Sequence, residues 1–241
     1  MKPKITVVMN TLNEDVLLLH RSIESYLNQE RVDLQLIIST VKGDKNIKYV
    51  KGKYPKIEII QMSRNNHLIS KGIKSPIGSF MQLNNALPFV RGDWFTFCSS
   101  NDYAYSNKLC AEIELCFSTS KEVCYSAYDT IDSNNELIKK YYFHDYDYTK
   151  HLAGNFVADS SVVSKRLVNK YLPFKIELKN YAYWHLWLSI FEGEGDVFCY
   201  NPHPTWAYMQ DEESMHVKRW KDEKLMAEAE IDKAKMLSLH Q

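Results

Sequence analysis

The sequence predicts an α/β fold with a mostly parallel central sheet that is flanked by helices. Short runs of β-branched and aromatic residues, typical of buried strands, alternate with longer segments in which apolar residues recur at helical spacing. Strands that are separated by helices pair in parallel, and the helices then cover both faces of the sheet. The 241 residues are 45% hydrophobic and 25% charged, which suffices for a core without disulfide bonds. Because neither a repeat nor a linker interrupts the pattern, we expect a single domain over residues 1–241.

The first half of the chain carries the clearest alternation of strand and helix. Ile5–Met9 is a continuous β-branched run, which indicates a buried strand. Asn13 suits the N-terminal cap of a helix whose apolar residues are Val16, Leu19, Ile23 and Leu27. The elements expected next are a strand at 34–39, a polar loop, a strand at 57–62, a helix over 78–90 that Pro88 ends early, a strand at 94–98, a helix over 107–117 and a strand at 123–128.

The second half is less regular. We expect a turn at 131–135, an aromatic and acidic stretch at 141–148, helices at 160–170 and 184–191, and a loop at Pro202 and Pro204 before 206–209. The tail over 220–239 is expected to be helical, and its balanced charges disfavour a membrane surface. This helix would pack on its own domain or on a second copy of the chain, as in a homodimer.

Charge and motif content exclude several classes of protein. Lys and Arg together number 30, as do Asp and Glu, so the zero net charge provides no basic field for nucleic acid. No apolar run is long enough for a transmembrane segment, and a strand-like run follows the first residues directly, unlike a signal peptide. The five cysteines form no C-x-x-C pair, so we expect buried free thiols and a cytoplasmic location. The sequence lacks glycine-rich phosphate loops, a G-x-S-x-G elbow and zinc-type histidine spacings, which disfavours dinucleotide oxidoreductases, P-loop enzymes, α/β-hydrolases and zinc enzymes.

Three segments carry a resemblance to a known family. They read ITVVMNTLNEDVLLLHRSIESYLNQ, then LNNALPFVRGDWFTFCSSNDYAYSNKL, then NYAYWHLWLSIFEGEG followed by NPHPTWAYMQDEESMH. In order and spacing, over roughly residues 4–216, these segments resemble family 2 glycosyltransferases of the glycosyltransferase-A fold. The resemblance implies one Rossmann-like domain, with a nucleotide-sugar half at about 1–103, an acceptor half at about 104–216 and a C-terminal helix at 217–241.

The resemblance also implies an activity and its partners. A sugar would pass from a nucleoside-diphosphate-sugar donor to a hydroxyl of a saccharide acceptor, with inversion of the anomeric carbon in a single in-line displacement. Parallel strands bring their following loops together at one edge of the sheet, where such a donor binds. The residues that the resemblance assigns to the donor are Thr11, Asn13, Thr40, Asn84, Asn101 and Asp102.

The metal motif of the family is altered in this chain. Ser99, Ser100, Asn101 and Asp102 stand where the family usually has Asp-x-Asp-Asp, and Asp211 stands where a late loop usually offers a histidine. Asn101, Asp102 and Asp211 would form an oxygen-rich site for Mn²⁺ or Mg²⁺. The alternative is a metal-free site in which Asn101 and Asp102 bond the ribose or the diphosphate directly. The literal Asp-x-Asp at 145–147 does not follow the 94–98 strand, so we interpret it as unrelated to the donor.

The general base is also altered. Ala182 and Tyr183 stand where the family usually has Glu-Asp, and a tyrosine is too weakly acidic to be a good base at neutral pH. The remaining candidates are Asp159 and His185, although His185 is turned by ~200° from Tyr183 on a helix. The loss of these carboxylates also supports a rival hypothesis, a non-catalytic module that binds sugar or nucleotide.

Tyrosine is abundant, with 16 copies in the chain. A tyrosine presents an apolar ring and a polar tip, which suits an amphipathic sugar. Six tyrosines cluster in the acceptor half: Tyr141, Tyr142, Tyr146, Tyr148, Tyr181 and Tyr183. Two interpretations stay open. Either at least two of these tyrosines contact sugar, or all six serve in ordinary packing.

Overall fold

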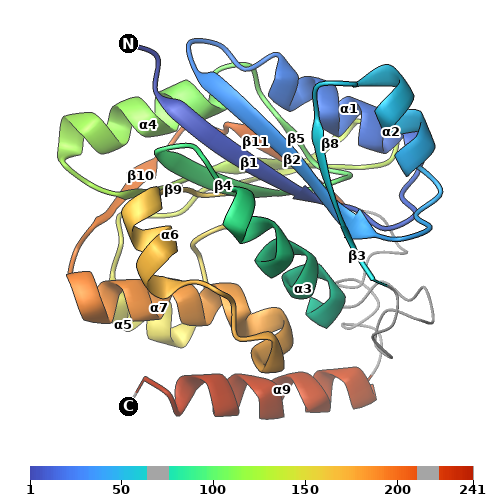
Figure 1. Ribbon diagram of the computed structural model, residues 1–241. Helices are drawn as coiled ribbons and strands as arrows, with labels where there is room; N and C mark the ends of the chain where they lie inside the picture. Colours follow the sequence, from blue (N-terminus) through green and yellow to red (C-terminus); the bar gives the residue numbers. More distant parts are fainter. Residues whose placement is uncertain (64–75, 211–222, 241) are drawn as a thin grey trace.

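The computed structural model describes residues 1–63, 76–210 and 223–240, and it confirms the α/β fold class (Figure 1). Its main sheet has seven strands in the order β10-β6-β9-β4-β1-β2-β3. The bounds of these strands, in chain order, are β1 (Lys4–Asn10), β2 (Asp33–Val41), β3 (Glu58–Met62), β4 (Trp94–Ser99), β6 (Val123–Ser126), β9 (Val162–Ser164) and β10 (Phe198–Asn201). All neighbours pair in parallel except β9, which runs antiparallel to both β4 and β6.

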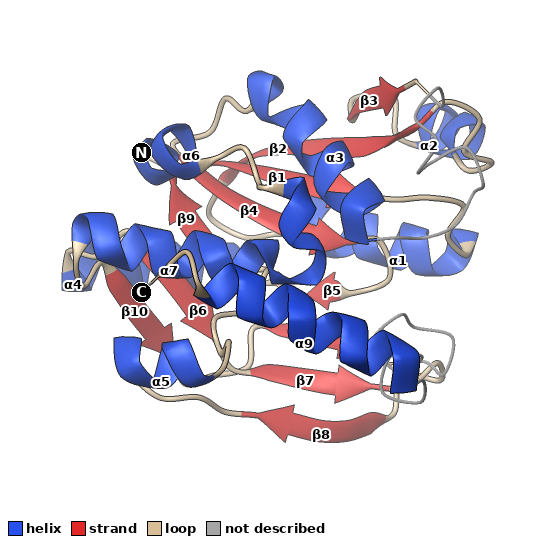
Figure 2. Ribbon diagram, turned by 90° about the horizontal axis from the view of Figure 1, so that it is seen from below, coloured by secondary structure: helices blue, strands red, loops and turns tan. Residues whose placement is uncertain are grey.

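Helices cover both faces of the main sheet. Their bounds are α1 (Val16–Leu27), α2 (Ile47–Lys53), α3 (Pro76–Ala86), α4 (Lys108–Thr119), α5 (Tyr148–Ala153), α6 (Lys165–Tyr171) and α7 (Ala182–Glu194). Side chains of α1 and α4 pack with alternate residues of β1, namely Ile5, Val7 and Met9. The opposite face, which includes Val8, packs against α3, α6 and α7 (Figures 1 and 2). The period-two alternation of a strand therefore divides the core into two layers.

A second sheet of four strands lies beside the main one, in the order β5-β11-β7-β8. Its strands are β5 (Tyr103–Ala104), β7 (Tyr128–Ile131), β8 (Leu137–Tyr141) and β11 (Trp206–Met209). One face is apolar, because Ile131, Ala207 and Met209 pack there with Leu18, Tyr103 and Tyr105. The turn expected at 131–135 joins β7 to β8, and the Asp132 backbone N–H donates to the Glu136 carbonyl (3.0 Å).

Two of the expected segments differ in the structure, whereas other details match. The helix expected at 160–170 was wrong at its start, because residues 162–164 form β9 and the helix begins only at Lys165. Val162 and Val163 are β-branched and pair with β6, which favours the strand. The polar loop expected after β2 contains α2, while α3 ends before Pro88 as expected and continues as a short 3₁₀ turn. All five cysteines are buried and free, which confirms that expectation.

The C-terminal helix α9 (Glu223–Leu237) packs on its own domain (Figure 2). Its partner is η2 (Ile176–Tyr181), a 3₁₀ segment that precedes α7. Lys179 of η2 forms an ion pair with Asp232 of α9 (2.8 Å), and Met236 is fully buried in the core. The homodimer stays a prediction. Within residues 1–63, 76–210 and 223–240, no helix combines the length and the apolar character needed to cross a bilayer.

Candidate active site

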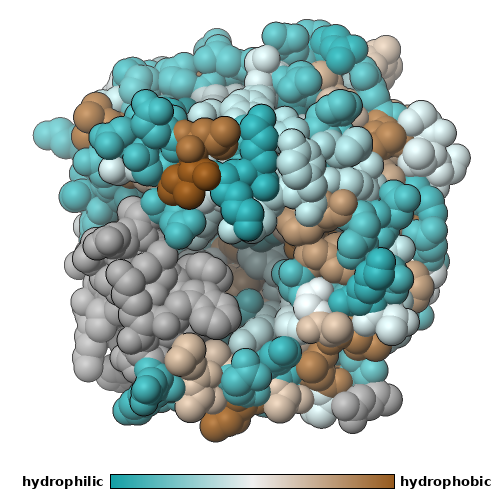
Figure 3. Space-filling view, turned by 180° about the vertical axis from the view of Figure 1, so that it is seen from behind, coloured by the Kyte–Doolittle hydropathy of each residue, from teal (hydrophilic) through white to brown (hydrophobic). Residues whose placement is uncertain are grey.

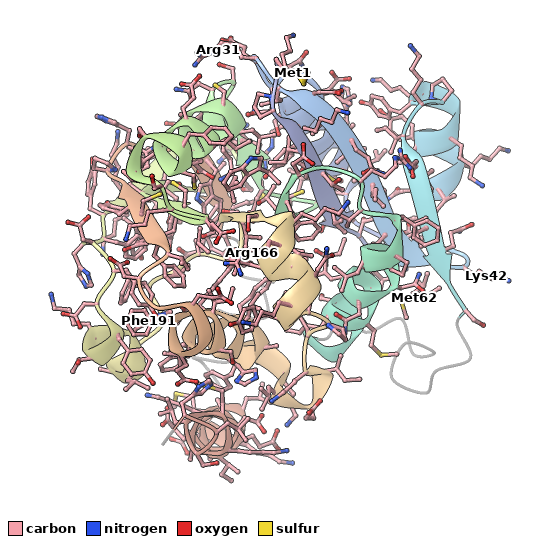
Figure 4. All side chains as sticks on the ribbon, turned by 60° about the vertical axis from the view of Figure 1, so that its left-hand side comes forward. Met1, Arg31, Lys42, Met62, Arg166 and Phe191 are labelled. Carbon is pink, nitrogen blue, oxygen red and sulfur yellow. The ribbon has the colours of Figure 1, made fainter. Side chains whose placement is uncertain are left out.

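The ends of β1, β2 and β4 meet at one edge of the main sheet. Asn10 is in register with Ser39 of β2 on one side and with Ser99 of β4 on the other. The next strand ends beside them, since Lys42, just after β2, donates its N–H to the Met62 carbonyl of β3 (2.9 Å; Figure 4). The loops that follow these strands therefore converge, which is the arrangement that forms ligand sites in open parallel sheets.

The loop after β1 contains two of the predicted donor residues. Thr11 donates its N–H to the Ser39 carbonyl (3.1 Å), and its buried hydroxyl has no hydrogen-bond partner among the described residues. Asn13 has a positive φ of 52°, and its side-chain oxygen accepts from the Lys45 N–H (3.0 Å). The loops after β1 and β2 are thus fixed to each other, and the Thr11 hydroxyl is a buried polar group that the described residues leave unpaired.

Thr40 is hydrogen-bonded to Asp44, a carboxylate that was not predicted from the sequence. The Thr40 hydroxyl donates to Asp44 (2.7 Å), and the Asn46 N–H donates to the other oxygen of the same carboxylate (2.9 Å). Thr40, Asp44 and Asn46 are all buried. A carboxylate therefore lies three residues beyond the end of β2, where the loop folds back. The signal was the turn at Gly43, whose positive φ of 83° returns the chain toward Thr40.

Asp102 lies directly after β4, within the altered metal motif. It is only 8% exposed, and its carboxylate accepts from the Met209 N–H of β11 (2.9 Å). Burial raises its pKa well above the usual range, and the negative charge of Asp159 adds to the increase. The structure therefore brings two of the predicted residues, Asp102 and Asp159, into the same electrostatic environment.

Asp159 combines exposed surface with a perturbed pKa. The residue is exposed, yet the protein atoms that crowd its carboxylate raise its pKa, while a hydrogen bond from the Ser160 N–H opposes the increase. Tyr183 is another neighbour, and burial followed by the charge of Asp159 raises its pKa well above the usual range. A carboxylate with a raised pKa, open to solvent, has the properties of a general base.

Arg21 is a second residue that sequence reasoning missed. It extends from α1, and its guanidinium donates to the Asn101 carbonyl (2.5 Å) and to the Asn135 side chain. The same group lies 4.8 Å from the centre of the Tyr103 ring. Burial lowers the pKa of Arg21, and the charge of Asp102 opposes this effect. A cation therefore joins the altered metal motif to the β7–β8 turn, which no local motif in the sequence indicated.

His185 lies on another side of α7. Its Nδ1 is 2.7 Å from Nε2 of His240, and its Nε2 is 3.5 Å from the Ser189 hydroxyl. Burial, followed by the charge of Lys175, lowers its pKa to about 4. Because Tyr183, turned by ~200° on the helix, is the residue near Asp159, these contacts do not bring His185 to the carboxylates. Of the two base candidates, the geometry favours Asp159.

Asn84 and Asp211 complete the predicted site residues. The Asn84 side chain donates to the Phe174 carbonyl (2.9 Å) and accepts from the Phe174 N–H (2.8 Å). Both the oxygen and the nitrogen of its amide are therefore hydrogen-bonded to the backbone of Phe174. The contact of Asn84 with the donor stays a prediction. Asp211 lies outside the described residues. Within the described part of the chain, no three His, Cys, Asp or Glu side chains gather as a metal site.

The literal Asp-x-Asp has a structural role at the start of α5. The Asp147 side chain accepts from the Lys150 N–H (3.0 Å) and caps this helix. Tyr146 stacks on Phe198 (4.0 Å) and Tyr148 on Phe191 (4.8 Å), a residue of α7 labelled in Figure 4. These two rings are used in packing.

Comparisons with known proteins bear on the sequence and the fold of the chain. No model of a known protein family matches the chain. The chain is 27% identical over 199 residues to an uncharacterized glycosyltransferase of Methanocaldococcus jannaschii, a match that covers 76% of this chain and 64% of the relative. The chain thus spans 64% of the relative's length.

Solved structures of S. aureus TarS have the same fold. Residues 1–349 of TarS in complex with UDP match 98% of this chain with a TM-score of 0.66 at 13% identity, which covers 70% of the TarS chain. The complex with UDP-GlcNAc matches 98% of this chain and 71% of the TarS chain with a TM-score of 0.65 at 11% identity. The chain therefore has a glycosyltransferase fold, and it is glycosyltransferase-like in both sequence and structure.

Proposed function

We propose that the protein is a glycosyltransferase that moves a hexosyl or pentosyl group from a nucleoside-diphosphate sugar to a hydroxyl of a saccharide, with inversion of the anomeric carbon. The observation that carries the proposal is the pair of carboxylates, Asp102 and Asp159, beside the loops that follow β1, β2 and β4. The relative in M. jannaschii supports the reaction class, and the TarS complexes with UDP and UDP-GlcNAc support a uridine-linked donor.

In this reaction the acceptor oxygen forms a bond to the anomeric carbon. The bond between that carbon and the diphosphate oxygen breaks, and the electron pair leaves with the nucleoside diphosphate. The proton of the acceptor hydroxyl passes to Asp159, whose raised pKa and exposed surface suit a base. Tyr183 does not suit this role, because its raised pKa keeps the phenol protonated.

Thr11, Asn13 and Asp44 would contact the nucleotide, since they lie in the two loops that are hydrogen-bonded to each other. A divalent cation would be held by Asp102 and Asn101, with Asp211 as the third oxygen ligand, and it would neutralise charge on the leaving diphosphate. The donor set consists of oxygen atoms only, which suits Mg²⁺ or Mn²⁺.

The test is incubation of the full chain with UDP-, GDP- and dTDP-sugars, with and without Mn²⁺, while release of the nucleoside diphosphate is measured. We expect slow donor hydrolysis that Asp102→Asn abolishes. Absence of both binding and turnover across the panel would contradict the proposal.

The rival hypothesis is a non-catalytic module that binds sugar or nucleotide. One observation favours it: Tyr183, at the position where a base is expected, is packed against Phe80, Phe97 and Phe174. Binding of a nucleotide sugar with no hydrolysis, by both the wild type and Asp102→Asn, would support this module over the enzyme.

A further inference from the structure

Four aromatic rings lie together on one face of the second sheet. Tyr128 is at their centre, with its ring centre 5.0 Å from that of Tyr141, 4.7 Å from that of Trp206 and 6.4 Å from that of Tyr208. Strand register explains the cluster. Tyr128 is opposite Tyr141, and Trp206 and Tyr208, which are two residues apart on β11, lie on the same face of the sheet. We refer to these four residues as the aromatic face. The opposite face of the sheet carries Ile131, Ala207 and Met209 and packs against Leu18 of α1.

The aromatic face borders the two carboxylates of the candidate active site. Asp102 accepts a hydrogen bond from the N–H of Met209, the residue that follows Tyr208 on β11 (2.9 Å). Burial raises the pKa of Tyr128, and the charges of Asp159 and Asp102 both add to the increase. A ligand on these rings would therefore have its edge beside the proposed base.

The aromatic face retains accessible surface and an unused polar group. Tyr128, Tyr141 and Tyr208 are each half-buried, and only Trp206 is fully covered. Thr130 is in register with Tyr208 and shares a face with Tyr128, two residues away. It is 1% exposed, and its hydroxyl has no hydrogen-bond partner within the described part of the chain. The molecule is also visibly hollowed on the side shown in Figure 3.

We propose that the aromatic face is the acceptor subsite and that its ligand is a pyranose ring. This inference rests on the proposed function. A pyranose has an apolar C–H face that packs on an aromatic ring, and hydroxyls at its rim that bond to carboxylate oxygens. An aliphatic chain would leave the Thr130 hydroxyl, which has no partner among the described residues, unsatisfied, at a cost in affinity. One hydroxyl of the bound ring would face Asp159.

The cluster also indicates which ring to change. Lys139 places its ammonium 4.5 Å from the centre of the Tyr141 ring, so this tyrosine is already covered by a cation. Tyr128 supports all three other rings, and its removal would disturb the sheet. Tyr208 lies at the margin of the cluster, which makes Tyr208→Ala the informative variant and Tyr208→Phe its conservative partner.

The experiment is saturation-transfer NMR on the full chain with UDP present. The probes are methyl β-D-glucopyranoside, methyl β-D-galactopyranoside and methyl α-D-mannopyranoside. We expect transfer to the ring C–H protons of at least one glycoside, with affinity about tenfold weaker in Tyr208→Ala because one ring contact is lost. Tyr208→Phe retains the ring and should retain binding. Tyr148→Ala, which removes a ring from the packing on Phe191, is the matched control and should also retain it.

Separate readouts distinguish failure of the subsite from failure of the proposed function. UDP binding, measured by calorimetry, should be the same in all variants. A wild type that binds UDP but transfers no saturation to any glycoside would overturn the subsite alone, as would unchanged glycoside affinity in Tyr208→Ala. Displacement of the glycoside by an equal concentration of n-hexanol would identify an apolar-chain surface and would also overturn it. A wild type that binds none of UDP, GDP and dTDP would remove the proposed function itself.

Discussion

Asp159 differs from the buried Asp102 in combining a raised pKa with exposed surface. The charge of Lys108 acts on its carboxylate, and it lowers the pKa less than burial raises it. Lys108 is fully buried and is held by both oxygens of Glu112 (2.7 and 2.9 Å). The charge that lowers the pKa of the base candidate is therefore held in place by a buried ion pair that is far from Asp159 in sequence.

Replacement of Asp159 by Asn should reduce turnover about 100-fold or more, because general-base catalysis contributes about 10²–10⁴-fold. Nucleotide affinity should stay unchanged, since the donor loops are intact. The wild-type rate should fall as the pH drops below the raised pKa of Asp159, because only the carboxylate accepts a proton. Release of nucleoside diphosphate against pH is the measurement. Asp147→Asn, at the cap of α5, is the control, and an equal loss in both variants would contradict the role of Asp159.

Asn84 tests a residue for which the sequence and the structure suggest different roles. The resemblance assigns it to the donor, whereas both ends of its amide bond to the backbone of Phe174. We expect Asn84→Ala to lower the free energy of unfolding by about 2 kcal/mol, since two hydrogen bonds are lost. Nucleotide affinity should be unaffected. Asn85→Ala, the next residue of α3, is the matched control. A large loss of UDP affinity at full stability would restore the role that the resemblance implies.

At the scale of elements, strands and helices with strong local patterns were predictable from the sequence. β1 and α1 were found because a β-branched run and a helical apolar stripe are each visible over a few residues. β8 was missed because Leu137–Lys140 is an exposed edge without alternation. β9 was missed because its pairing with β4 and β6 comes from tertiary structure, not from its own three residues.

The same difference between local patterns and tertiary contacts explains which residues of the candidate site were predicted from the sequence. Asp102 and Asp159 were predicted because each lies in a segment that resembles a known motif. Arg21 and Asp44 were not, because their roles depend on contacts between loops that are apart in sequence, such as Arg21 with Asn101 and Asn135. The aromatic face was predicted only through Tyr141, since strand register brings Tyr128 and Tyr208 beside it.

The connection into β4 requires a glycine. A Cβ at Gly92 would lie 2.4 Å from the Thr6 nitrogen and 2.6 Å from the Ile5 carbonyl carbon, both backbone atoms. We therefore expect Gly92→Ala to lower the free energy of unfolding by about 3 kcal/mol, because the clash can be relieved only by moving the sheet. Gly52→Ala is the matched control, since nothing lies within 4 Å of its added Cβ. In α2 it should stabilise by about 0.5–1 kcal/mol. Denaturant unfolding measures both, and equal stability of the two variants would contradict the packing argument.

At the scale of the whole molecule, stability depends on pH through groups with opposite effects. Burial lowers the pKa of His151 to about 4, and burial raises the pKa of Asp102. The unfolded chain therefore binds protons at His151 more readily than the folded chain, and the reverse holds at Asp102. The two contributions to the slope of stability against pH have opposite sign, so a measurement on the wild type alone does not separate them.

A variant of His151 isolates its contribution. The ring is fully buried, and its neutral form satisfies both nitrogens, since Nε2 is 2.9 Å from the Asn155 oxygen and Nδ1 accepts from the Tyr146 hydroxyl (2.9 Å). Protonation would break the second bond, and the charge of His240 also opposes it. The folded pKa lies below the unfolded value, so the stability due to His151 is present above about pH 6.5 and is lost as the pH falls toward 4.

We therefore compare the wild type with His151→Gln. At pH 7 the variant should be less stable, and the difference should shrink by about 3 kcal/mol as the pH falls from 6.5 to 4, because one pKa unit corresponds to about 1.4 kcal/mol. Urea unfolding at several pH values measures the difference, in which the carboxylate contributions cancel. A constant difference would contradict the buried neutral imidazole. If the variant does not fold, NMR titration of His151 in the wild type gives the same answer, since a pKa near 6.5 would exclude the effect.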